Sequence, residues 1–477
     1  MSDDSHAEIS FGQARAFLAA LMLVVPVLGL AVGLGLRTRS RTDWLTLASA
    51  WSLALTISVP SLYAALAYTL GRRRAWLAWC FPLVVRPALA AVGLLLALQG
   101  AVLVGAAGVI SEALDLGGLM VVPILVGLGF VGTAWLVLLE ALASVRVPPL
   151  VLTGLVIDQQ LPTLRSRVEA LALKLKAQPP QRIIVGLEAR AFVTAMPINL
   201  RGQGLLPAAE TLYLPTCALW LLSDAEQEGL IGHELAHFRG ADLRFTERFL
   251  PSLQSLENAG QNVAPDDGRV GVFNTYTRLA RFPALWLVQG MALILVSAVN
   301  RIRRGRELEA DQLATEVCRK TDFALGLMKL TMLTFWWKPF RTVYIQRAAA
   351  GRALRNLGEG YVWTVKNSLL KVESAKLQAA LLHSQLAHPI DTHPPLLERF
   401  RLLGVEPGAI FNEAKAHIDR ATSAPADIVA LEEALSAIEI EWVRVPGTPV
   451  TVMDLPPAER LASAATPASP ANGRNEN

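Results

Sequence analysis

The sequence predicts a mainly α-helical protein in which a multi-pass helical membrane region precedes an α+β domain with a small β-sheet. The composition supports this prediction, because 53% of the 477 residues are hydrophobic, 18% are charged and the mean hydropathy is +0.40. An ordinary soluble domain is less apolar. Long uncharged stretches fill the sequence before about residue 140, whereas charged and amphipathic segments follow Pro148 and Pro149. The boundary between the two regions therefore lies near residue 146.

Four apolar stretches near the N-terminus are each long enough to cross a bilayer, since a helix needs about 20 apolar residues to do so. They lie at about residues 16–36, 44–70, 87–110 and 117–139. The first stretch is longer than the apolar segment of a signal peptide, and acidic residues precede it. We therefore expect residues 1–145 to form a membrane region with four transmembrane helices.

The charged loops between these stretches indicate how the chain is oriented in the membrane. Cytoplasmic loops are rich in Lys and Arg, which assigns residues 72–74 and Arg86 to the cytoplasm and the loop with Glu112 and Asp115 to the other side. The region after residue 146 is then cytoplasmic, and we expect a bacterial inner (plasma) membrane. Three arginines in the first loop oppose this orientation: Arg37, Arg39 and Arg41. A re-entrant helix would change the assignment.

Charge and cysteine content exclude some other classes of protein. Lys and Arg number 44 against 40 Asp and Glu, a net charge of +4, which is too balanced for the basic surface of a nucleic-acid-binding protein. The cysteines Cys80, Cys217 and Cys318 are too widely spaced to suggest a disulfide framework or a cysteine metal site. We expect no nucleic-acid partner and a reducing compartment for the functional domain.

Short periodic segments organise the sequence after residue 146. Helical spacing of apolar residues predicts a helix over 161–177, and β-forming residues predict strands over 182–195 and 211–214. Ser223 and Glu226 then form a capping box that opens a helix through Phe238. Residues 406–455 are expected to form a helical C-terminal extension, and the Ala-, Pro- and Asn-rich residues 456–477 a disordered tail.

The helix that begins at Ser223 carries the motif His-Glu-Leu-Ala-His at residues 233–237. His233 and His237 are four residues apart and therefore adjacent on one helix face, where both can bind one zinc ion. Glu234 lies beside that position and can take a proton from a water molecule. The alternative interpretation is a surface helix with two solvated histidines.

A catalytic zinc site normally uses three protein ligands, so a third must come from elsewhere in the chain. Glu307 and Asp311 lie four residues apart on one face of another predicted helix, whereas Glu309 points elsewhere. We predict that Glu307 is the third ligand and that Asp311 accepts a hydrogen bond from a ligating imidazole. The alternative is a solvated acidic face beside nearby arginines.

Three segments together resemble a known family. The sequence HELAH at 233–237, RELEAD at 306–311 and THPP at 392–395, with Arg399 six residues after His393, is similar to the HtpX-like membrane zinc metallopeptidases, which are relatives of the CaaX prenyl endopeptidases. The resemblance covers residues 150–400 approximately. It implies a zincin-like peptidase domain over 146–405 with a gluzincin-type site.

The resemblance also implies a role for each matching residue. One Zn²⁺ per chain would be bound by His233, His237 and Glu307, with Glu234 as the general base and acid and Asp311 supporting a ligand. His393 would be a second catalytic residue that helps to hold the substrate or to stabilise the tetrahedral intermediate, and Arg399 would contact the substrate or transition state. Without the family, His393 can equally be a solvated histidine in a proline-rich loop.

The function expected from these features is that of a membrane metalloendopeptidase acting on proteins or peptides, including misfolded membrane proteins as its relatives do. A scaffold or sensor with a structural zinc site, or processing of prenylated peptides, are the alternatives. The segment 192–196 could pair with an extended substrate or lie inside the sheet.

Two features depart from the family pattern. Four spans precede the peptidase domain where two are typical, and the uncharged segment 283–300 lies between the two zinc motifs. This segment is either a fifth span or a buried or interfacial helix. Any excursion into the membrane must return, because Glu307 has to reach His233.

Overall fold

The computed structural model describes residues 23–36, 43–70, 74–115, 120–144, 147–157, 161–239, 242–264, 272–383, 394–421, 424–445 and 449–454. The chain divides into two compact units. The first comprises residues 1–147, 244–305 and 388–392, and the second comprises residues 148–243, 306–387 and 393–477. The predicted combination of apolar helices with a mixed domain that contains small sheets is confirmed.

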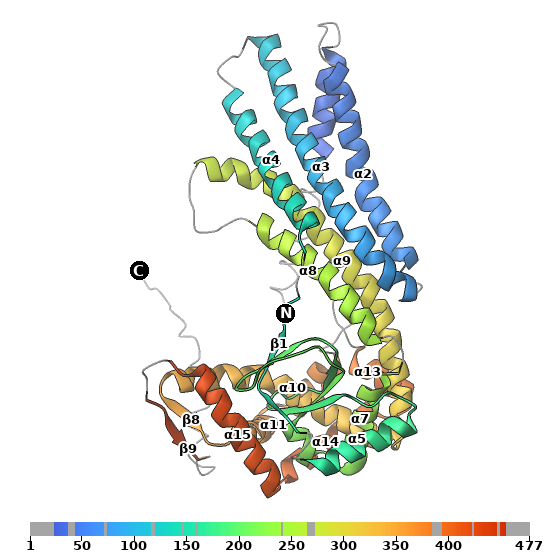
Figure 1. Ribbon diagram of the computed structural model, residues 1–477, viewed down its shortest axis with the longest axis vertical. Helices are drawn as coiled ribbons and strands as arrows, with labels where there is room; N and C mark the ends of the chain where they lie inside the picture. The colour runs from blue at the N-terminus through green and yellow to red at the C-terminus, as the bar shows by residue number, and fades with distance from the viewer. Residues whose placement is uncertain are drawn as a thin grey trace. The chain divides into compact units, whose positions relative to one another are not determined.

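Long helices, most of them apolar, form the first unit. They are α2 (Asp43–Leu70), α3 (Arg74–Leu114) and α4 (Val121–Leu142), which lie side by side in Figure 1, together with most of α8 (Asp242–Val263) and α9 (Val272–Ala314). All five helices contribute buried side chains to one hydrophobic core, among them Leu96, Val137, Leu256 and Leu295. Small residues allow close packing in this unit, as at Gly100, where an added Cβ would lie 2.9 Å from the Cβ of Phe130.

Among the described residues, four helices are long and apolar enough to cross a membrane. Their spans are Asp43–Thr69, Leu83–Leu114, Val121–Leu142 and Arg281–Ala314, which suggests membrane insertion. The first three coincide with the predicted spans 44–70, 87–110 and 117–139. Of the predicted span 16–36, only the shorter apolar helix Leu23–Gly35 lies within the described residues.

The segment 283–300, predicted as a fifth span or a buried or interfacial helix, is part of the long helix α9, whose residues Arg281–Ala314 form a candidate membrane span. The charged residues that follow it continue the helix without interruption as far as Ala314, because no proline stands between Asn300 and that residue. The chain leaves the second unit in α8 and returns to it in α9. This path meets the requirement that Glu307 return to the motif at residues 233–237.

Two small sheets begin the second unit. Their strands are β1 (Leu150–Leu152), β2 (Gly154–Val156), β3 (Arg182–Gly186), β4 (Phe192–Thr194), β5 (Ile198–Leu200), β6 (Gly204–Leu206) and β7 (Thr211–Pro215). One sheet has the order β2-β3-β7-β4, in which β3 and β7 are parallel and the other pairs antiparallel. The other sheet has the order β1-β5-β6.

The structure corrects one strand prediction. Residues 182–195 do not form one strand but two, β3 and β4, which lie on opposite sides of β7. Between them the chain turns at charged residues, where Arg190 pairs with Glu188 at 2.9 Å. The predicted helix over 161–177 and strand over 211–214 are confirmed as α5 (Pro162–Lys174) and β7.

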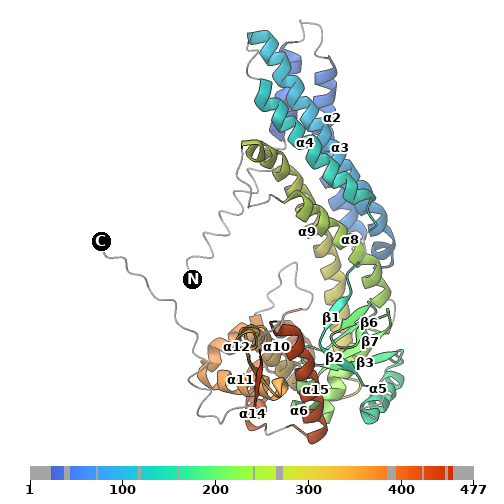
Figure 2. The same ribbon diagram turned by 60° about the vertical axis from the view of Figure 1, so that its left-hand side comes forward.

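Helices make up the rest of the second unit (Figure 2). They are α6 (Thr216–Leu221), α7 (Asp224–Ala236), α10 (Lys320–Ala349), α11 (Leu357–Lys371), α12 (Ser374–His383), α13 (Leu396–Leu403), α14 (Pro407–Arg420) and α15 (Ala426–Val443); a strand pair, β8 (Arg352–Leu354) and β9 (Thr451–Met453), completes it. Phe323 of α10, Phe400 of α13 and Phe411 of α14 share one core. The C-terminal helices α14 and α15 are thus built into this unit, and residues 456–477 lie outside the described residues.

The N-terminus of α7 is fixed by the predicted capping box and by a buried ion pair. The backbone N–H of Ser223 donates to Glu226 at 2.9 Å, and the Ser223 hydroxyl accepts from the Glu226 N–H at 3.4 Å. Lys329 of α10 donates to both oxygens of the Glu226 carboxylate, at 2.7 and 2.8 Å, and also to the carbonyl of Leu221. The Glu226–Lys329 ion pair thus holds the start of α7 against α10.

Two glycines let other segments approach α7 closely. A Cβ added to Gly229 would lie 2.7 Å from Cys318 Sγ and 3.3 Å from Cα of Phe323, and a Cβ at Gly232 would lie 2.8 Å from Val317. Larger residues at these positions would push α7 away from the end of α9 and the start of α10.

We expect Lys329→Met to destabilise the second unit strongly. The substitution leaves the Glu226 carboxylate buried without its cation, which costs about 3 to 5 kcal/mol. The purified Lys329→Met protein in detergent should have a clearly lower thermal unfolding midpoint than the wild type. Lys338→Met, at an exposed position of the same helix, should leave it unchanged; equal midpoints for the two variants would contradict the anchoring role.

Candidate metal centre

The two histidines of the HELAH motif lie on one face at the end of α7. The helix ends at Ala236, two residues earlier than predicted, but His237 keeps helical backbone angles (φ −71°, ψ −20°) as its C-cap. The four-residue spacing therefore still places His237 beside His233. Their ring centroids are 5.2 Å apart, with the rings nearly perpendicular.

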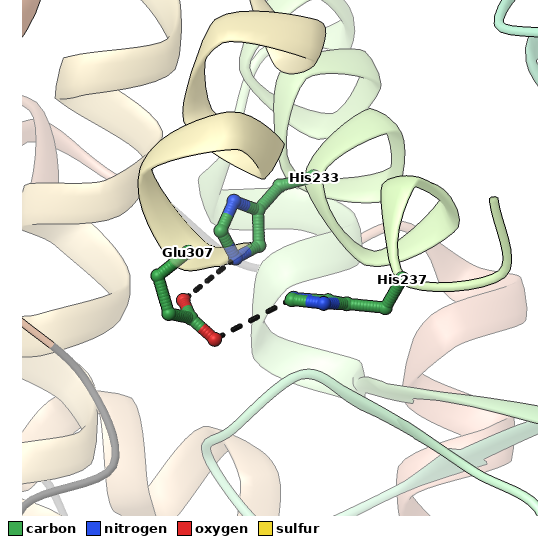
Figure 3. A group of neighbouring side chains, drawn as sticks. All are labelled: His233, His237 and Glu307. Carbon is green, nitrogen blue, oxygen red and sulfur yellow. Dashed lines mark ion pairs between the residues drawn. The ribbon is translucent and has the colours of Figure 1, made fainter. Parts of the chain in front are cut away.

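The structure brings Glu307 of α9 to these two imidazoles. One carboxylate oxygen of Glu307 lies 3.3 Å from His233 Nε2, and the other lies 3.5 Å from His237 Nε2. Figure 3 shows the carboxylate facing both rings. Glu307 and His233 are buried, and His237 is half-buried.

The spacing of these three groups fits a tetrahedral metal ion. One donor atom from each residue can be chosen so that all lie within 4.8 Å of one another. Ligands about 2.0 to 2.1 Å from a tetrahedral zinc ion are roughly 3.4 Å apart, close to both carboxylate–imidazole distances. Two imidazoles and one carboxylate also match the donors that catalytic zinc sites use. The three residues can therefore hold one zinc ion.

Asp311 lies one turn beyond Glu307 on α9 and faces the other side of the His233 ring. A carboxylate oxygen of Asp311 is 3.0 Å from His233 Nδ1, while Nε2 of the same ring faces Glu307. Such a carboxylate fixes the tautomer and orientation of a metal-binding imidazole. Glu309, by contrast, is exposed and pairs with Arg306 at 2.6 Å, as its predicted orientation requires.

These contacts control the protonation of His233 and Asp311. Burial alone lowers the pKa of His233, but hydrogen bonds to Asp311 and Glu307 and their negative charges outweigh burial and raise it to about 10. Burial raises the pKa of Asp311, but the charge and hydrogen bonds of Arg399, with a further contribution from His233, hold it below its ordinary value. Without a metal the imidazole is therefore protonated, and a metal ion must displace that proton to bind.

Arg399, for which a contact with the substrate or transition state is predicted, lies beside Asp311. Its side chain, on α13, is buried and donates through Nε (2.8 Å) and through Nη2 to the two oxygens of Asp311. The guanidinium thus orients Asp311, and through it His233, instead of facing an exposed surface. His393, the other predicted contact, lies outside the described residues.

Glu234 is buried on α7, next to His233 in the sequence. Its carboxylate is near enough to Arg399 for the two charges to interact and to favour the charged form of the arginine. The predicted base thus lies in the same buried group of charges as Asp311 and Arg399.

The sequence did not assign a role at the site to two of its neighbours. Phe323 of α10 stacks on the His233 ring with centroids 5.8 Å apart, and Arg306 donates to the carbonyl of Arg239 at 3.2 Å, just after the motif. Phe323 looks like any core residue, and Arg306 stands in a run of arginines. Their roles depend on contacts between residues that are 67 or more positions apart.

Comparison with known proteins agrees with this geometry. Residues 159–405, just over half of the chain, match the model of Peptidase family M48, so the chain belongs to that family. Comparison with curated proteins and with solved structures gives no match. Members of the family are zinc metallopeptidases, and the matched segment contains both metal-site helices and Arg399.

We expect Arg399→Met to weaken metal binding although Arg399 is not itself a metal ligand. Loss of the guanidinium frees the Asp311 carboxylate, and loss of such a supporting group typically lowers metal affinity about 10- to 100-fold. Competition for zinc with a chromogenic chelator measures this directly. The exposed Arg401→Met on the same helix is the matched control. Unchanged zinc affinity in a folded Arg399→Met protein would refute the positioning role.

Proposed function

We propose that this M48 peptidase is a zinc-dependent endopeptidase that cleaves protein substrates, with Glu234 as the general base. The approach of Glu307 to His233 and His237, at 3.3 and 3.5 Å, is the observation that carries the proposal. Three protein groups leave a fourth position for water, as catalytic sites require, whereas a structural zinc site normally has four protein ligands.

Each residue of the site has a distinct part in the proposed mechanism. His233, His237 and Glu307 would hold the ion, which when bound supplies Lewis-acid activation of a water molecule and of the scissile carbonyl. Glu234 takes the proton of the attacking water and delivers it to the departing amine. Asp311 and Arg399 keep the His233 ring in the orientation that leaves Nε2 available for the ion.

The position of β4 supports recognition of an extended substrate. This strand pairs with β7 on one side, and no other described strand pairs with its second edge. A free edge can add a substrate strand through main-chain hydrogen bonds, which gives affinity with little side-chain selectivity. Phe192 and Val193 on β4 are only half-buried and accessible to such a strand.

The apolar helices also support the proposal that the substrates are found at a membrane. We propose that the second unit faces the cytoplasm of a bacterial inner membrane and acts on misfolded or membrane proteins. The apolar spans α2, α3 and α4, together with that of α9, would keep the peptidase at the membrane where such substrates are found.

Glu234→Gln tests the enzyme proposal. The amide cannot accept the proton, so cleavage of an unfolded membrane protein by the purified enzyme should fall by about 100- to 10,000-fold. A chelator should abolish the wild-type activity. Bound zinc, measured in parallel, should stay at one ion per chain in the variant; full activity in that zinc-loaded variant would show that the site is not a peptidase site.

Backbone methylation of a peptide substrate tests strand addition at β4. Replacing the amide hydrogens that flank the scissile bond by methyl groups removes main-chain donors, so we expect KM to rise while kcat changes little. A matched peptide methylated five or more residues away should be cleaved normally. Equal KM values for the two peptides would rule out main-chain pairing.

A further inference from the structure

The ring of Phe323 covers one face of the His233 imidazole. The two ring centroids are 5.8 Å apart, the ring planes differ by 25°, and both side chains are buried. Offset stacking at such a separation is a favoured arrangement of flat rings. Phe323 belongs to α10, which carries none of the three metal-binding residues, so a further helix contributes a side chain to the site.

Gly229 makes room on α7 for this ring. It lies four residues before His233 and therefore on the same helix face. A Cβ added to Gly229 would lie 3.2 Å from Cδ2 and 3.3 Å from Cα of Phe323. The Glu226–Lys329 ion pair holds α10 against the start of the same helix. The Phe323 ring is thus held firmly beside His233, because α7 has no side chain at residue 229 and α10 is anchored nearby.

The carboxylates around His233 do not by themselves fix the plane of its ring. Asp311 contacts Nδ1 at 3.0 Å, and Glu307 faces Nε2 at 3.3 Å. A hydrogen bond to Nδ1 sets the direction of that atom but leaves the ring free to tilt about it. A metal ion binds the Nε2 lone pair, which lies in the ring plane, so a tilted ring would direct the lone pair away from the ion. The flat face of Phe323 opposes this tilt.

We propose that Phe323 is a positioning residue of the metal site, which sets the plane of the His233 ring and keeps water from one of its faces. The inference rests on the proposed zinc site and adds to it a residue outside both sequence motifs. Phe323 offers no ligand atom, so it acts through His233. Its apolar ring also strengthens the contact between His233 and Asp311, because polar groups interact more strongly where water is excluded.

Cobalt substitution of the full-length protein in detergent tests this role, because the visible d–d absorption of Co²⁺ reports how its ligands are arranged. Phe323→Leu and Phe323→Met remove the flat ring but keep an apolar side chain. Both variants should have an altered Co²⁺ spectrum. They should also bind zinc about 2- to 10-fold more weakly in competition with a chromogenic chelator, as the loss of one ring–ring contact implies. Phe323→Tyr, which keeps the ring, should retain the wild-type spectrum.

Phe411→Leu is the matched control. Phe411 is buried in the same core as Phe323, but on α14, which carries no metal-site residue. Its loss should lower stability while the Co²⁺ spectrum and the zinc affinity stay those of the wild type. Unchanged spectra and zinc affinity in folded Phe323→Leu and Phe323→Met, or an equal change in Phe411→Leu, would show that Phe323 serves the core alone. A wild type that binds neither ion would instead refute the metal site on which the inference rests.

Discussion

The structure depends on one contact, that of the Glu307 carboxylate with the imidazoles of His233 and His237, which lie 70 or more positions earlier in the sequence. A metal ion tolerates errors of only a few tenths of an ångström in ligand position, so α7 and α9 must be fixed to one another and not merely close. The Glu226–Lys329 pair holds the start of α7 on α10. Arg306, next to Glu307, holds the chain just after the motif. Because Gly232 has no side chain, Val317, just after the end of α9, can pack closely against α7.

A series of hydrogen-bonded charged groups supports the metal-site residues: His233 contacts Asp311, and Asp311 accepts from Arg399. All three side chains are buried, and each charge there would be costly without the next one. Helix α13 thereby becomes part of the site through Arg399, which also interacts electrostatically with Glu307. The same physics applies at Glu439 of α15, which lies outside the family-matched segment and contacts two arginines within it. In both places a C-terminal helix completes a buried charge arrangement begun earlier in the chain.

The sequence predicted those features that local chemistry determines. Ser223 and Glu226 form the expected capping box, because both partners lie within one helical turn. The stretches that became α2, α3 and α4 were recognisable because bilayer insertion depends on length and composition. Glu307 and Asp311 could be chosen because their spacing puts both on one helix face. The split of residues 182–195 into two strands could not be foreseen, since β4 pairs with β7 and not with β3. The bond of Arg399 to Asp311, 88 residues away, likewise has no local signal.

Zinc K-edge absorption spectroscopy of the purified protein tests the central claim most directly. The account predicts one zinc per chain, with two imidazole nitrogens and a carboxylate oxygen at about 2.0 to 2.1 Å. Glu307→Ala should lose the carboxylate contribution and bind the ion far more weakly. A spectrum without the scattering pattern of two imidazoles, or one unchanged in Glu307→Ala, would show that α7 and α9 do not share a metal ion.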